Sequence, residues 1–190
     1  MAPHPLTRTS RFLSRVLRHD PAAAGVELDP HGWASVDRLI EGARRNGVPL
    51  TRELLAQVVA DNDKQRFSLD ADGRRIRAAQ GHSLAVDLGL VPEPPPATLY
   101  HGTAVRHLDS IRRNGLQPGR RQHVHLSATP GIARQVGARH GPPVVLAIDA
   151  DGLHRTGHAF FRAANGVWLT ASVPPERIRF ADAGTQRGAN

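Results

Sequence analysis

Residues 66–77, Arg-Phe-Ser-Leu-Asp-Ala-Asp-Gly-Arg-Arg-Ile-Arg, decide how the first half of this chain folds. Two short segments, residues 66–69 and 74–77, flank the pair Asp72-Gly73. Apolar side chains in these segments follow the two-residue period of a β-strand, and an Asp-Gly pair readily forms a tight turn between two strands. The stretch therefore predicts a β-hairpin, and its arginines make that hairpin basic.

Three helices are expected before the hairpin. Apolar residues recur every three to four positions in segments that begin near Ser10, Ser35 and Thr51, and these residue types are typical helix N-caps. We expect Pro21 to end the first helix and Asn46-Gly47 to end the second. Three helices and a basic hairpin predict a winged helix, a fold that binds nucleic acid in some proteins and serves as a scaffold in others.

Proline is concentrated near the middle of the chain, in Val91-Pro92-Glu93-Pro94-Pro95-Pro96. Such a run favours extended polyproline geometry and acts as a stiff spacer. We therefore expect one domain over residues 1–94 and a second over residues 97–182. Residues 183–190 are small or polar, and we expect them to form a disordered tail.

The second half alternates short apolar strands with short helices, which predicts a small α+β domain. A helix is expected from Leu108 to the stop at Asn114-Gly115. The expected strands cover residues 99–100, 123–127, 144–148, 160–161, 167–169 and 178–180. Because side chains alternate along a strand, His123, His125 and Ser127 share one face, and such a polar row suggests a bound ligand.

The composition points to an anionic partner. The formal net charge is +8, and Lys64 is the only lysine among 25 basic residues, so almost every cation is an arginine that can grip a phosphate with two parallel hydrogen bonds. Residues 97–190 hold 12 basic and 5 acidic residues, against 13 and 12 in residues 1–96, so the excess lies in the second half. Nucleic acid is the first candidate partner.

Several classes of function are disfavoured. The chain has no cysteine, which removes disulfides, thiol nucleophiles and cysteine-built zinc sites. His123 and His125 have no third metal ligand near them in the sequence, so we expect no metal. Neither a dinucleotide-binding glycine fingerprint nor a phosphate loop is present. Without a long apolar run or a signal-peptide core, we expect a soluble, cytoplasmic protein that does not associate with membranes.

Five blocks of the sequence stand out together. They are Arg18-His19, Asn62-Asp63-Lys64-Gln65-Arg66-Phe67, Leu99-Tyr100-His101-Gly102-Thr103, Arg121-Gln122-His123-Val124-His125-Leu126-Ser127 and Asn165-Gly166-Val167-Trp168-Leu169-Thr170. In this order they resemble the tRNA 2′-phosphotransferase family, called Tpt1 or KptA. The resemblance implies a winged-helix lobe followed by an ADP-ribosyltransferase-like lobe that binds NAD, with no metal.

The resemblance also implies a two-step reaction. The 2′-phosphate of an RNA, of the kind that a splicing pathway leaves, attacks the nicotinamide-bearing ribose carbon of NAD and expels nicotinamide. In the 2′-phospho-ADP-ribosylated RNA, the ribose 2″-hydroxyl then attacks phosphorus. The products are RNA with a 2′-hydroxyl, nicotinamide and ADP-ribose 1″,2″-cyclic phosphate. The implied partners are therefore NAD and an RNA with an internal 2′-phosphate, and we expect a monomer.

Site residues carry over from the resemblance. The catalytic group maps onto Arg18, His19, Arg66 and Arg121. The NAD-binding group maps onto His101, Gly102, Thr103, Ser110, Gly115, His125, Ser127 and Val167. His19 is a candidate for protonating the departing RNA 2′-oxygen or for hydrogen bonding to the phosphate. The choice of Arg121 over its neighbour Arg120 depends on its distance of two residues from His123.

The residues suit this chemistry, and two alternatives stay open. A phosphate monoester is largely dianionic at neutral pH, so it needs arginines to position it rather than a general base. Protein-modifying ADP-ribosyltransferases typically use a glutamate, but the only glutamate after residue 97 is Glu176, and Val167 lies at the matching position. One alternative is an ADP-ribosyltransferase that modifies terminal phosphates of nucleic acids. The other is a winged-helix regulator without enzymatic activity.

Overall fold

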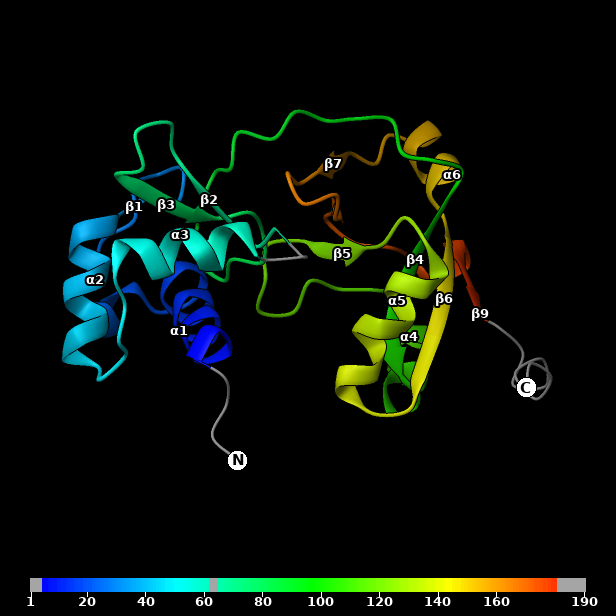
Figure 1. Cartoon of the computed structure of the whole chain (residues 1–190). Coiled ribbons are helices and arrows are strands. Elements are labelled where there is room, and N and C mark those ends of the chain that lie inside the picture. Colours follow the sequence, from blue (N-terminus) through cyan, green and yellow to red (C-terminus); the bar gives the residue numbers. More distant parts are fainter. Residues whose placement is uncertain (1–4, 62–64, 181–190) are drawn as a thin grey trace. The chain divides into compact units, whose positions relative to one another are not determined.

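The computed structural model describes residues 5–61 and 65–180 of the chain. They belong to two compact units, Met1–Leu90 and Val91–Asn190, and the division falls where the proline-rich run begins (Figure 1). Both units combine helices with small antiparallel sheets, so the α+β class is confirmed. Residues 183–190, expected to be disordered, and Asn62-Asp63-Lys64 of the second block lie outside the described residues.

The first unit packs three α-helices against a three-stranded antiparallel sheet in the order β1-β3-β2. Its core is formed by apolar side chains of all three helices and of the sheet, among them Leu13, Leu39, Leu55 and Ile76. The elements are α1 (Pro5–Arg18), the short 3-10 helix η1 (Pro21–Ala24), β1 (Ala34–Ser35), α2 (Val36–Arg45), α3 (Arg52–Ala60), β2 (Phe67–Leu69) and β3 (Arg75–Ala78).

Two of the three predicted helix starts are confirmed. The hydroxyl of Ser35 accepts a hydrogen bond from the backbone N–H of Arg38, and Thr51 caps α3 in the same way. The predicted start at Ser10 is wrong, because α1 begins at Pro5 and Ser10 lies inside it. A proline is favourable in the first turn of a helix, and the extra turn brings Leu6 against the core.

The predicted hairpin is confirmed. β2 and β3 pair in antiparallel register from Phe67 opposite Ala78 to Leu69 opposite Ile76. Gly73 in the turn has a φ of +68°, a backbone angle that side chains disfavour. The Asp70 carboxylate closes the turn, since it accepts hydrogen bonds from the backbone N–H and from Nε of Arg75.

The second unit contains two three-stranded antiparallel sheets, ordered β4-β6-β9 and β5-β8-β7. They are joined where Tyr100 of β4 and Ser127 exchange two backbone hydrogen bonds of 2.9 and 2.7 Å. The elements are β4 (Thr98–Ala104), η2 (Val105–His107), α4 (Leu108–Asn114), β5 (Val124–Leu126), α5 (Pro130–Gly137), η3 (Ala138–His140), β6 (Pro143–Asp149), α6 (Ala150–Arg155), β7 (Phe160–Arg162), β8 (Trp168–Thr170), η4 (Pro175–Arg177) and β9 (Ile178–Phe180).

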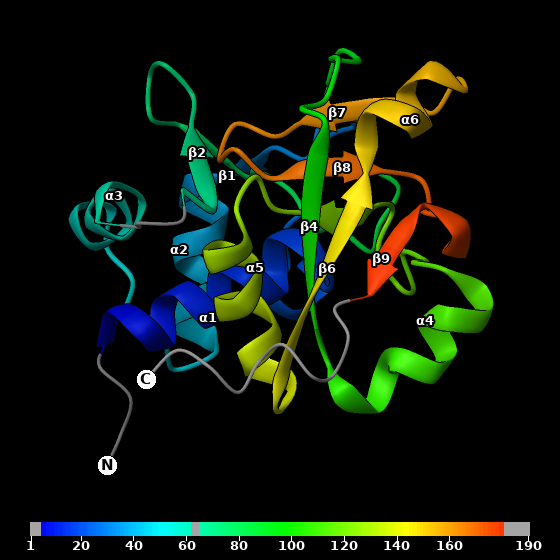
Figure 2. The same ribbon diagram turned by 90° about the vertical axis from the view of Figure 1, so that its right-hand side faces the viewer.

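The predicted strands and the helix over residues 108–114 are confirmed, with shifts at some strand ends. α5 is an element that the sequence analysis did not predict, and Figure 2 shows it alongside β4 and β6. Thr129 caps this helix and Pro130 opens it, which is a start signal that a search for apolar periodicity overlooks. Among the described residues, no helix is both long and apolar enough to cross a membrane.

α5 lies against β4 at two glycines. A Cβ on Gly102 would overlap the backbone oxygen of Ala133, and a Cβ on Gly137 would lie 2.7 Å from the backbone oxygen of Thr103. Because the two backbones touch where side chains would otherwise separate them, α5 is held directly on the strand that carries His101.

Candidate functional site

The junction of the two sheets brings His101 of β4 next to β5. Nδ1 of His101 lies 3.0 Å from the backbone oxygen of His125. A carbonyl oxygen only accepts hydrogen bonds, so Nδ1 carries the hydrogen. Burial lowers the pKa of His101, which favours the neutral ring. Its Nε2 is therefore an acceptor, suited to a ligand hydroxyl or amino group.

The alternation predicted for residues 123–127 is confirmed. Val124 and Leu126 are buried in the core, whereas His123, His125 and Ser127 are partly exposed. His123 also packs edge-on against Phe161 of β7, with 5.8 Å between the ring centroids, and burial lowers its pKa. One histidine of the polar row thus has a packing role, and whether the row binds a ligand stays a prediction.

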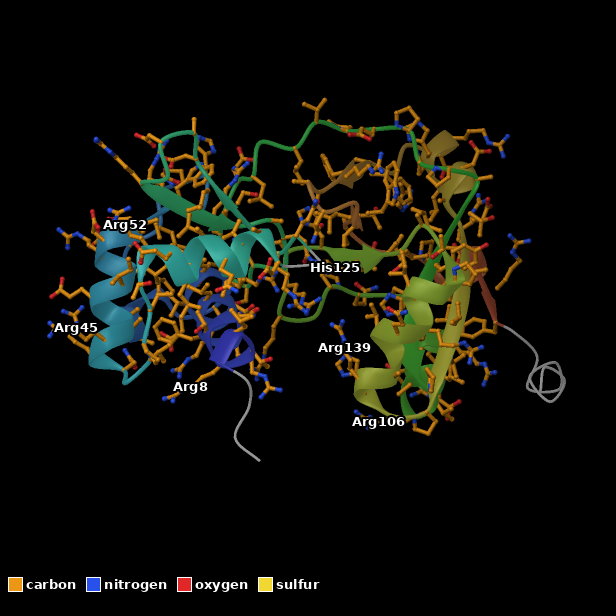
Figure 3. The ribbon with its side chains drawn as sticks, in the orientation of Figure 1. Arg8, Arg45, Arg52, Arg106, His125 and Arg139 are labelled. Carbon is orange, nitrogen blue, oxygen red and sulfur yellow. The ribbon has the colours of Figure 1, made fainter. Side chains whose placement is uncertain are left out.

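Arg121 lies beside this row. Its Nη1 is 3.4 Å from Nδ1 of His125, and loss of part of its solvent together with the positive charge of Arg139 lowers its pKa. Figure 3 labels His125 on β5 and Arg139 in η3, just after α5. Two like charges near each other make this region of the second unit strongly attractive to an anion.

Carboxylates do not neutralise this cluster. Within the described part of the chain, no ion pair includes Arg121 or Arg139. Three carboxylates of the second unit instead pair with arginines outside the cluster, at α4, at α6 and between β6 and η4. These pairs are Asp109 with Arg112, Asp151 with Arg155, and Asp149 with Arg177. Arg121 and Arg139 therefore keep their positive charges without a carboxylate partner in the described part of the chain, and Arg121 lies beside His125.

Four other residues predicted to bind NAD have structural partners. Gly102 and Thr103 form the close approach to α5. Gly115 ends α4 with a φ of +68°, where a Cβ would overlap the backbone oxygen of Val173. Ser110 is exposed on α4, with its Oγ 3.5 Å from Nδ2 of Asn114. The close contacts account for glycine at positions 102 and 115, and the roles of all four residues toward NAD stay predictions.

Val167 lies just before β8, in a turn. Its backbone oxygen accepts a hydrogen bond from Ala163, and its N–H lies 3.4 Å from the side-chain oxygen of Asn165. The side chain is partly exposed. An apolar residue therefore stands where protein-modifying ADP-ribosyltransferases typically have a glutamate, as the resemblance implies, and the role of Val167 toward NAD stays a prediction.

In the first unit, Arg18 and His19 lie at the end of α1 and contact a segment far along the sequence. Ser83 donates its backbone N–H to the carbonyl of Arg18 at 3.0 Å, and its Oγ lies 3.0 Å from Nδ1 of His19. Arg66 precedes β2, and its carbonyl accepts a hydrogen bond from Ala79 beyond β3. The helix end and the sheet edge thus fix the backbone of all three predicted catalytic residues in this unit.

His82 is a further residue near this pair that sequence reasoning missed. Its side chain is 2% exposed, and neither ring nitrogen has a hydrogen-bond partner among the described residues. Burial, reinforced by the positive charges of Arg18, His19 and Arg77, lowers its pKa to about 4. The segment shows no apolar periodicity, so its sequence gave no signal that a histidine would be enclosed there.

This buried histidine predicts an acid-sensitive fold. The pKa of His82 is about 6.5 unfolded and about 4 folded, so the unfolded chain binds more protons between those values. Above pH 6.5 the neutral ring of His82 contributes fully to stability. As the pH falls toward 4 this contribution is lost, and the free energy of unfolding decreases by on the order of 3 kcal/mol. In urea unfolding, His82→Leu should lose correspondingly less stability than the wild type between pH 7 and pH 4. Equal losses in both proteins would contradict this.

No group of three histidine, aspartate or glutamate side chains that could hold a metal ion occurs within residues 5–61 and 65–180. The arginines and imidazoles described above can bind anions and can accept or donate hydrogen bonds.

The chain is similar in sequence to a known protein family and to several named proteins. Residues 4–172 match the family described as RNA 2′-phosphotransferase, Tpt1 / KptA family. A relative named probable RNA 2′-phosphotransferase from Pseudomonas aeruginosa (strain UCBPP-PA14) is 59% identical over 177 residues, covering 93% of this chain and 97% of the relative. Relatives with the same name are 52% identical in Hahella chejuensis, over 95% of this chain and 97% of the relative, and 51% identical in Streptomyces coelicolor, over 91% and 94%.

Proposed function

Because this chain belongs to the RNA 2′-phosphotransferase family, Tpt1/KptA, we propose that it removes an internal 2′-phosphate from RNA with NAD as co-substrate. In this scheme the RNA 2′-phosphate displaces nicotinamide from the ribose carbon of NAD. The ribose 2″-hydroxyl then attacks phosphorus and releases RNA with a 2′-hydroxyl and ADP-ribose 1″,2″-cyclic phosphate. We further propose that the first unit is a winged helix that binds RNA and that the second is an ADP-ribosyltransferase-like fold.

The observation that carries the proposal is the cationic cluster beside His101 and His125. Arg121 and Arg139 lack carboxylate partners among the described residues, which suits a site for phosphate groups. His101 offers Nε2 as an acceptor, and a ribose hydroxyl is a donor that fits it. NAD presents both phosphates and ribose hydroxyls, so the residues present suit this co-substrate.

The proposed catalytic roles follow from charge. The RNA 2′-phosphate carries nearly two negative charges and is already nucleophilic, so Arg18, Arg66 and Arg121 would bind and orient its oxygens. The same cations would stabilise the charge that builds on the phosphorus in the second step. His19 would protonate the departing 2′-oxygen of the RNA, or hydrogen bond to the phosphate.

The arginines of the hairpin differ in their availability to RNA. Arg75 is paired with Asp70 at 2.8 Å and lies 3.7 Å from Asp29, so much of its charge is neutralised in place. Arg77 has no carboxylate partner within the described residues, and its guanidinium lies 4.6 Å from the ring centroid of Trp33. We propose Arg77 rather than Arg75 as the hairpin cation that contacts the RNA backbone.

The proposal predicts a strict product pattern. A short RNA with one internal 2′-phosphate is incubated with the protein, with and without NAD and without added metal, and the products are separated. We expect loss of the phosphate only with NAD, together with nicotinamide and ADP-ribose 1″,2″-cyclic phosphate. The matched control is the same RNA with a 5′-terminal phosphate and no 2′-phosphate, which should stay unchanged.

Other outcomes separate the alternatives. An ADP-ribosylated RNA that accumulates would show that the protein completes only the first step. A modified 5′-phosphate control would favour the ADP-ribosyltransferase that acts on terminal phosphates. RNA binding without any NAD-dependent product would contradict the enzyme and favour the regulator.

A further inference from the structure

We propose that the segment Gly81-His82-Ser83, called here the clasp, is a positioning element for Arg18 and His19, and that the Ser83 hydroxyl sets the orientation of the His19 ring. The inference rests on the proposed role of His19 in the reaction. It concerns residues that lie more than 60 positions away from the pair in the sequence and that none of the recognised blocks contains.

Ser83 holds the pair with both its backbone and its side chain. Its N–H donates to the carbonyl of Arg18 at 3.0 Å, which fixes the clasp against the last turn of α1. Its Oγ then lies 3.4 Å from the same carbonyl and 3.0 Å from Nδ1 of His19. Because the backbone bond places the hydroxyl, the hydroxyl can in turn restrict rotation of the imidazole.

A hydroxyl is suited to a histidine that changes its protonation state. When Nδ1 of His19 carries a hydrogen, Oγ of Ser83 accepts it and can turn its own hydrogen toward the carbonyl of Arg18. When Nδ1 has a lone pair, the hydroxyl donates to it. If His19 acts as an acid, Nε2 gives its proton to the RNA 2′-oxygen while Nδ1–H stays bound to Ser83. The ring therefore keeps its orientation before and after proton transfer.

Gly81 and His82 complete the clasp on the side of Arg18. Gly81 has a φ of +90°, which disfavours any side chain, and a Cβ there would lie 3.6 Å from Nη1 of Arg18. His82 is buried next to it and is neutral at physiological pH, because its pKa is about 4. The clasp thus encloses Arg18 without adding a second positive charge to it.

The test compares Ser83→Ala with Ser83→Thr, which keeps the hydroxyl. Ser83 is exposed and packs in no core cluster, so both variants should fold. We expect Ser83→Ala to lower kcat about 10-fold or more with little change in KM for the RNA, and Ser83→Thr to restore most of kcat. Ser35→Ala is the matched control, since it removes a hydroxyl that caps α2 of the same unit. It should lower the melting temperature and leave kcat unchanged below that temperature.

A measurement on the free protein, without substrate, tests the orientation of the His19 ring independently of turnover. In ¹⁵N NMR spectra of the free protein, the ring nitrogens of His19 should report one dominant hydrogen-bonded state in the wild type and in Ser83→Thr. Ser83→Ala should shift the Nδ1 signal toward that of a solvated ring. Unchanged signals together with unchanged kcat in Ser83→Ala would overturn the clasp. If His19→Ala keeps wild-type turnover, the proposed role of His19 fails instead, whatever the clasp does.

Discussion

Arg121→Ala is expected to lower turnover of a 2′-phosphorylated RNA about 10³-fold, whereas Arg120→Ala should stay within about threefold of the wild type. Arg121 lies beside His125, has lost part of its solvent and has no carboxylate partner within the described residues. A cation in such a place interacts with a phosphate more strongly than one surrounded by water. Both arginines are exposed, but of the two only Arg121 lies within hydrogen-bond distance of His125 among the described residues, so Arg120, its neighbour in the sequence, is the matched control.

The measurement is single-turnover kinetics with saturating NAD, so that chemistry is separated from product release. Arg121→Lys extends the test, because lysine keeps the charge but loses the planar fork that binds two phosphate oxygens at once. We expect it to recover only a small part of the lost rate. A larger defect in Arg120→Ala than in Arg121→Ala would show that the carry-over from the family is displaced by one residue.

Gly102→Ala is expected to lower the free energy of unfolding by about 3 kcal/mol or more. The added Cβ would overlap the backbone oxygen of Ala133, and a backbone atom cannot turn aside as a flexible side chain can. α5 would have to move off β4, which carries His101, so NAD binding should weaken as well. Urea unfolding followed by circular dichroism measures the loss of stability, and calorimetric titration with NAD measures the loss of binding.

Gly131→Ala is the matched control in α5 itself. A Cβ at Gly131 would have no atom within 4 Å, and alanine favours a helix over glycine by up to about 1 kcal/mol. We therefore expect its stability to be unchanged or slightly raised. If Gly102→Ala unfolds at the same urea concentration as the wild type, the contact between α5 and β4 is not as tight as described.

The local pattern of the sequence predicted most of the elements and little of their packing. The caps at Ser35 and Thr51 and the turn at Asp72-Gly73 are set by residues within a few positions, and these predictions are confirmed. The start of α1 was misplaced because Ser10 can also lie inside a helix. α5 was missed because its start is marked by the cap Thr129 and by Pro130 rather than by apolar residues at helical spacing.

Some features of the candidate site could likewise be predicted from local sequence, whereas others depend on packing. The alternation of Val124 and Leu126 with the polar row is a property of any strand, and it is confirmed. Gly102 is predicted to bind NAD, and that role stays a prediction, while the structure shows a contact with the α5 backbone that by itself requires glycine. This contact joins residues about 30 positions apart in the sequence, so it could not be predicted from a local sequence pattern.

By itself, the sequence determined the family, the class of fold and the positions of the helix caps and turns, because each depends on residue types at fixed short spacing. Only the tertiary structure decided that His101 donates Nδ1–H to His125, that Ser83 holds His19 and that His82 is buried without a hydrogen-bond partner within the described residues. Hydrogen bonds, burial and the pKa values that follow depend on which atoms the folded chain brings within about 3 Å, and distance along the sequence does not set this.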